Sequence, residues 1–119
     1  MANEVFDLVK VIVAGLDDKK GVDIRVIRVD DLTVLADYFV ICNGSSTTQI
    51  KALADNVEVE TEKTGVRVLH REGYDGGGWI LLDYGSVIVH VFQTESRSFY
   101  KMESVWADGE QIDVSDLLK

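Results

Sequence analysis

Two apolar runs typical of β-strands, residues 79–83 and 86–92, stand only two residues apart in the chain. The connection between them is Tyr84-Gly85. A connection this short permits an antiparallel hairpin and excludes the long crossover that a parallel pair requires. If the turn is Tyr84-Gly85, counting outward gives the register. The expected pairs are Asp83–Ser86, Leu82–Val87, Leu81–Ile88, Ile80–Val89 and Trp79–His90.

Side chains alternate between the two faces of a hairpin, so its faces can be read from the sequence. One face is wholly apolar and consists of Ile80, Leu82, Val87 and Val89. The other is mixed and consists of Trp79, Leu81, Asp83, Ser86, Ile88 and His90. A tryptophan among polar groups is typical of an interface anchor, because it combines a large contact area with one hydrogen-bond donor. A tryptophan packed beneath a helix, with His90 bonded to the backbone, fits the same spacing.

The remaining segments alternate between helical and strand patterns. They predict a helix capped by Asn3, strands at 22–26 and 38–42, a helix from the Ser46–Gln49 capping box to Gly65, a strand at 66–70 and a helix at 94–106. The resulting order is α, β, β, α, β, β, β, α. This order predicts an α+β fold with a mixed sheet of about five strands and helices packed on it.

Length and charge limit the possible functions. The chain has 119 residues, no proline and no repeat, which predicts one domain over residues 1–108 and an acidic tail over 109–119. Its net charge of −9 argues against a nucleic-acid binder or an anionic membrane surface and favours a basic partner. No apolar run approaches the length of a membrane span and no leader pattern opens the chain, so we expect a cytoplasmic protein.

Residue types that could carry chemistry are few and scattered. Cys42 is the only cysteine, and His70 and His90 lack a third ligand, so we expect no metal site. Gly44-Ser45-Ser46 precedes a helix and could cradle a phosphate, but it equally fits an ordinary helix cap. No Asp-x-Asp follows it, as a nucleotidyltransferase would need for its two metals. We therefore expect no catalytic residue and no cofactor.

A run of motifs in sequence order resembles the ribosomal silencing factor (Iojap-like) family. The matching residues lie between positions 4 and 108: DYFVICNGSS at 37–46, then Gln49, Ala52, Ala54, Asp55, Val57, Glu72, Gly73, WILLDYG at 79–85, VIVHVF at 87–92, Arg97, Tyr100, Glu103 and Trp106.

The resemblance implies a non-enzymatic repressor of translation. Members bind the large ribosomal subunit through a small basic protein of its intersubunit face, large-subunit ribosomal protein number fourteen. There they block joining of the small subunit when nutrients are scarce. Their fold is similar to that of nucleotidyltransferases without the catalytic carboxylates, and they often form homodimers. An acidic chain suits a basic partner of this kind.

The same resemblance indicates where the contact lies, because Trp79, Asp83, Tyr84 and His90 match the most characteristic segment. It implies aromatic anchors at Trp79 and Tyr84 and a partner for arginine or lysine at Asp83. His90 would instead fix the rotamer of Trp79. Ser86 departs from the pattern, because the family usually has an acid there, and this departure implies weaker binding or binding through Asp83.

Arg97 and Tyr100 also match the family, but on an expected helix where packing explains them equally well. Two alternative functions remain compatible with the sequence. One is an enzyme of the nucleotidyltransferase type, which nucleotide and magnesium binding would reveal. The other is a dimeric adaptor without a ribosomal role, for which the apolar residues of the acidic tail could form the contact.

Overall fold

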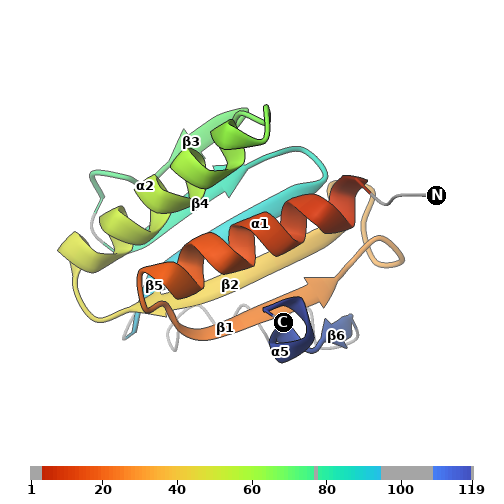
Figure 1. Cartoon of the computed structure of the whole chain (residues 1–119), viewed down its shortest axis with the longest axis horizontal. Helices are drawn as coiled ribbons and strands as arrows, with labels where there is room; N and C mark the ends of the chain where they lie inside the picture. The colour runs from red at the N-terminus through yellow and green to blue at the C-terminus, as the bar shows by residue number, and fades with distance from the viewer. Residues whose placement is uncertain (1–3, 77, 95–108, 119) are drawn as a thin grey trace.

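The computed structural model describes residues 4–76, 78–94 and 109–118. These residues form a six-stranded sheet of order β3-β4-β5-β2-β1-β6, and helices α1 and α2 lie against one of its faces (Figure 1). The elements are α1 (Glu4–Asp18), β1 (Val22–Arg28), β2 (Tyr38–Gly44), α2 (Thr47–Lys63), β3 (His70–Glu72), β4 (Trp79–Asp83), β5 (Val87–Gln93), β6 (Glu110–Ile112) and α5 (Val114–Leu117). The expected α+β fold with a mixed sheet is confirmed, with one strand more than expected.

The centre of the sheet is the parallel pair of β2 and β5, and the other four pairings are antiparallel. Every residue of β2 is buried. An unbroken apolar run such as residues 38–42 is typical of a strand covered on both faces, and β2 is such a strand. The central pair therefore forms the rigid base on which the β4–β5 hairpin is held.

Helix α2 begins and ends where the sequence indicates. The Ser46 hydroxyl accepts a hydrogen bond from the Gln49 backbone N–H at 3.1 Å. The Gln49 side chain accepts from the backbone N–H of Ser45 at 2.6 Å, one residue earlier than in the usual capping box. At the other end, Gly65 has a φ of +86°, and the N–H of Val66 donates to the carbonyl of Thr61. This is the Schellman arrangement, in which glycine takes the left-handed position.

The strand expected at residues 66–70 is wrong in its position. The structure has β3 at His70–Glu72 instead, and Val66 and Val68 pack on the core from irregular backbone. The reason is the length of the neighbouring strand. β4 ends at Asp83, which pairs with His70 and accepts a hydrogen bond from the N–H of Leu69 at 2.8 Å, so residues 66–68 lie beyond the end of that strand. Apolar residues of a connecting segment that packs on the core thus produce the same sequence pattern as a strand.

The acidic tail packs onto the sheet. β6 pairs with the edge of β1 that faces away from β2. Across that pair, Arg28 Nη1 lies 3.7 Å from Glu110 Oε1. α5 follows, with Asp113 accepting from the Ser115 N–H at 3.0 Å as its cap. Leu117 of α5 is buried in the main core. The tail expected from the sequence therefore contributes both an edge strand and core contacts.

The expected register of the β4–β5 hairpin is wrong by two residues. The structure pairs Leu82 with Val89 and Trp79 with Phe92. Tyr84 donates its N–H to the carbonyl of Val87, so the connecting residues are Gly85 and Ser86. This choice puts Gly85, with a φ of +83°, where a hairpin turn requires positive φ. A shift of two preserves the alternation, so the two expected faces of the hairpin are confirmed.

The two faces of the sheet differ in composition. The first face lies under α1 and α2, and its strand residues include Val26, Tyr38, Val40, Cys42, Ile80, Leu82, Tyr84, Val87, Val89 and Val91. The second face is the opposite one, and its residues include Ile27, Phe39, Ile41, Trp79, Ile88, His90 and Phe92. The hairpin residues Trp79, Leu81, Asp83 and Ile88 of the second face are half-buried. In the described part of the chain, no helix is both long and apolar enough to traverse a bilayer.

Candidate functional site

The second face carries an aromatic group centred on Trp79 and His90. Trp79 starts β4 and His90 lies within β5, and the Trp79 Nε1–H donates to His90 Nδ1 at 3.1 Å. The Trp79 ring stacks on Phe92, with 5.2 Å between centroids and 25° between planes. Phe39 meets the His90 ring edge-on at 5.1 Å. Three neighbouring strands therefore hold the tryptophan in one orientation.

His90 is a buried and neutral group. It is 4% exposed, and burial lowers its pKa from 6.5 to about 4. Because tryptophan can only donate, Nδ1 must accept, and the proton of the neutral ring lies on Nε2. Nε2 is buried, and none of the described residues hydrogen-bonds to it. His90 thus serves as an acceptor that orients Trp79, and at neutral pH it brings no positive charge to this face.

Asp83 holds the turn at the end of β4. Its Oδ1 accepts a hydrogen bond from the N–H of Gly85 at 2.7 Å, and the side chain is half-buried on the second face. The bond fixes the tight connection in which Gly85 takes its positive φ. The family resemblance implied a partner for arginine or lysine at this position. In the structure the carboxylate already has a local role, and its charge remains at the edge of the second face.

Tyr84 does not lie on the surface, where the family resemblance placed an aromatic anchor. It is 7% exposed, belongs to the first face, and its hydroxyl lies 2.9 Å from Thr61 Oγ1 of α2. Burial raises the pKa of this phenol. The expected surface anchor at Tyr84 is therefore wrong. The cause is the turn: with Gly85 and Ser86 as the connection, Tyr84 continues the strand alternation and points inward.

Ser86 ties the hairpin to the central strand through its backbone. Its carbonyl accepts from the N–H of Asp37 at 2.7 Å and from the N–H of Tyr38 at 3.2 Å. Any amino acid can make these two bonds, so the structure gives no reason for a serine in place of an acid. Arg97, Tyr100 and the helix expected at 94–106 lie outside the described residues, apart from Thr94. The Asn3 cap also lies outside them.

A groove beside Trp79 was not predicted from the sequence. It has a volume of about 270 Å³, and Glu72, Gly73, Trp79 and Leu81 line it. Glu72 is the last residue of β3, and Trp79 and Leu81 are alternate residues of β4 on the second face. Two sequence features could have indicated this groove. Leu81 shares the face of Trp79 by alternation, and Glu72-Gly73 belongs to the matched motifs.

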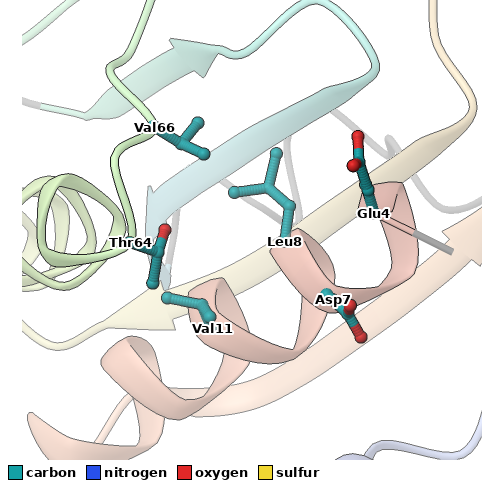
Figure 2. A pocket seen from close by; sticks show the side chains of 6 residues that line it. All are labelled: Glu4, Asp7, Leu8, Val11, Thr64 and Val66. Atoms are coloured by element: carbon teal, nitrogen blue, oxygen red, sulfur yellow. The ribbon is translucent and has the colours of Figure 1, made fainter. Parts of the chain in front are cut away.

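A second groove lies on the other side of the molecule, between α1 and the end of α2. It has a volume of about 390 Å³ and is lined by Glu4, Asp7, Leu8, Val11, Thr64 and Val66. Figure 2 shows Leu8 and Val66 pointing toward each other across it, while Asp7 points away. Carboxylates, aliphatic groups and one hydroxyl make up the described part of this lining.

The other candidates for chemistry have structural roles. Cys42 is buried within β2, and Ser46 caps α2. His70 is exposed on β3, where its Nε2 lies 2.9 Å from Glu72 Oε1, whereas His90 is buried in β5. Within residues 4–76, 78–94 and 109–118, no three histidine, cysteine or acidic side chains gather closely enough to hold a metal. The remaining described feature of the second face is Trp79 with the groove beside it.

The fold and the described site define the class as a small α+β domain with an aromatic second face and an acidic net charge. The family model described as "Ribosomal silencing factor during starvation" matches residues 2–119, so this chain belongs to that family. The chain is 36% identical to the ribosomal silencing factor RsfS of Bacillus subtilis over 107 residues, 90% of this chain and 91% of that protein.

A solved structure and a eukaryotic relative extend the comparison. The crystal structure of a Chromobacterium violaceum protein matches with a TM-score of 0.86 and 34% identity, over 93% of this chain and 92% of that one. A mouse protein named "Mitochondrial assembly of ribosomal large subunit protein 1" is 31% identical over 85% of this chain and 45% of its own length. The Chromobacterium violaceum protein therefore has the fold of this chain, and the other two relatives are similar to it in sequence.

Proposed function

We propose that this chain represses translation by binding the large ribosomal subunit through large-subunit ribosomal protein number fourteen. In the bound position it occupies the space that the small subunit needs, and joining of the two subunits is blocked during starvation. The family description and the names of the relatives support a silencing role on the ribosome. The mouse relative's name refers to the large subunit. Such a protein works in the cytoplasm, where the ribosomes are.

The second face of the sheet is the proposed contact, and the fixed Trp79 is the observation that carries it. Trp79 is half-buried, held by His90 and Phe92, and next to a groove. A large side chain held in one orientation loses little conformational entropy on binding, which is typical of an interface anchor. Asp83 supplies negative charge at the edge of the same face.

The charge of the whole chain supports a basic partner. The net charge is −9, and a field of this sign speeds the approach of a cationic surface and disfavours bare ribosomal RNA. Blocking by occupied space requires no bond to form or break. The proposed activity therefore needs no catalytic residue, no metal and no cofactor.

Trp79→Ala tests the contact directly. Loss of a tryptophan anchor weakens binding by about 2 kcal/mol or more, which is at least a 30-fold rise in Kd. Purified large and small subunits are incubated with the protein and sedimented, and the bound fraction is measured. We expect binding to large subunits alone, and strong loss for the variant.

Val59→Ala is the matched control, because Val59 is a half-exposed apolar residue of α2, on the other side of the sheet. It should bind as the unchanged protein does. Undiminished binding by Trp79→Ala would remove the second face from the contact, and no binding by the unchanged protein would contradict the proposed function. Sedimentation equilibrium of the free protein separately tests the expected homodimer.

A further inference from the structure

The groove beside Trp79 has one apolar wall and one acidic rim. Trp79 and Leu81 present aromatic and aliphatic surface, and Glu72 places a carboxylate at the end of β3. Gly73 forms the remaining wall with a φ of +77°. A Cβ at Gly73 would overlap the carbonyl oxygen of Trp79, so only glycine allows the chain to pass this close to β4.

The loop that follows Gly73 is held in place by contacts to α2. The Tyr74 hydroxyl donates to Asp55 Oδ2 at 2.8 Å. The Arg71 guanidinium lies 4.2 Å from the centre of the Tyr74 ring, and its Nη1 donates to Glu58 at 2.9 Å. These bonds link β3 and the loop to a long helix. The groove is therefore formed before any partner arrives, which lowers the entropy cost of filling it.

Glu72 is the one acid among the described residues that line the groove. The nearby basic residue Arg71 is engaged by Glu58, and Lys51 lies 3.9 Å from Asp75. Glu72 is exposed, and its Oε1 meets the imidazole of His70 at 2.9 Å. A carboxylate accepts several hydrogen bonds through two oxygens, so Glu72 can bind a further donor.

We propose that this groove receives one lysine or arginine side chain of the basic ribosomal protein to which the chain binds. The aliphatic stem lies along Leu81 and Trp79, and the cationic head reaches Glu72. Long basic side chains bury their stems on apolar surface while the charge stays at the rim, and tryptophan attracts a cation near its ring. The inference rests on the proposed function and names the chemistry that its contact recognises.

Glu72→Gln is the test, because it removes the charge and preserves the shape. Binding of the full chain to purified large subunits is measured at several salt concentrations. We expect Kd to rise about tenfold at low salt, the size of a lost charge-assisted bond. We also expect binding of the variant to fall less steeply with added salt, because one ion pair is missing.

Glu62→Gln is the matched control. Glu62 is an exposed acid of α2, so the substitution removes the same charge from the other side of the sheet. Its Kd should change less than twofold. Equal Kd values for Glu72→Gln and the unchanged protein would overturn the groove proposal, and so would equal losses for both variants, which would mean a long-range charge effect. Failure of the unchanged protein to bind would instead overturn the proposed function.

Discussion

The two faces of the β4–β5 hairpin use the same strands for different purposes. On the first face, Ile80, Leu82, Val87, Val89 and Val91 are all fully buried and aliphatic. On the second face, aromatic rings surround a buried histidine, and Trp79 remains half-buried. These aliphatic residues need no function to explain them, since burial alone stabilises them. The mixed face includes a costly buried imidazole, and this difference identifies where a partner is expected.

The largest effect should come from the first face. Leu82 is fully buried under α2, so Leu82→Ala removes core contacts and should lower the free energy of unfolding by about 2–5 kcal/mol. Urea unfolding measures the loss. Leu81→Ala, on the same strand but half-buried on the second face, is the control and should cost less. An equal loss at both positions would mean that the faces do not differ in this way.

The next effect is a pH dependence that belongs to the second face. The pKa of His90 is lowered by burial from 6.5 to about 4, so the folded protein holds this imidazole neutral. Above pH 6.5 the His90 imidazole is neutral in both the folded and the unfolded chain, so it does not make stability depend on pH. As pH falls from 6.5 toward 4, the His90 imidazole binds a proton in the unfolded chain but stays mostly neutral in the folded chain. Stability should therefore fall by about 3 kcal/mol across that window from this group.

His90→Gln should reduce the slope of unfolding free energy against pH between about 6.5 and 4, the interval set by His90. Urea titrations at several pH values measure it. His70→Gln, which removes the exposed histidine of β3, controls for the loss of an imidazole as such. An unchanged slope in His90→Gln would show that the buried imidazole does not resist protonation.

The smallest effect concerns Tyr84, which belongs to the first face. Tyr84→Phe removes a hydroxyl that lies 2.9 Å from Thr61 Oγ1, while Thr61 keeps its bond to the carbonyl of Glu58 at 3.2 Å. We expect a loss of about 1 kcal/mol in unfolding free energy and no change in binding to large subunits. Tyr74→Phe, whose hydroxyl bonds Asp55 on the surface, should cost less. A loss of binding in Tyr84→Phe would place Tyr84 at the interface.

The division between the two faces could be predicted from the sequence because it depends only on alternation. Trp79 and His90 fall on one face and Leu82 and Val89 on the other in either register, since a shift of two residues preserves alternation. The pairs themselves required the turn. Only the structure shows that Gly85 takes the positive φ of the turn. Tyr84 therefore continues the strand alternation, and its side chain points into the core.

Other features depend on contacts between distant segments, which no local pattern contains. β6 is an edge strand of three residues, and only its pairing with β1 defines it. The sequence of residues 110–112 therefore does not by itself predict a strand. The groove at Glu72 needs β3, β4 and the loop that Tyr74 fixes to α2. The motifs could indicate Glu72-Gly73, but its position beside Trp79 is a consequence of strand pairing.

The most direct test of the central claim is a subunit-joining assay. Large subunits are incubated with the protein, small subunits are added, and the joined fraction is measured by sedimentation. We expect the joined fraction to fall as the protein occupies large subunits, and Trp79→Ala to restore it at the same concentration. Large subunits that carry the bound protein and still join normally would contradict the claim.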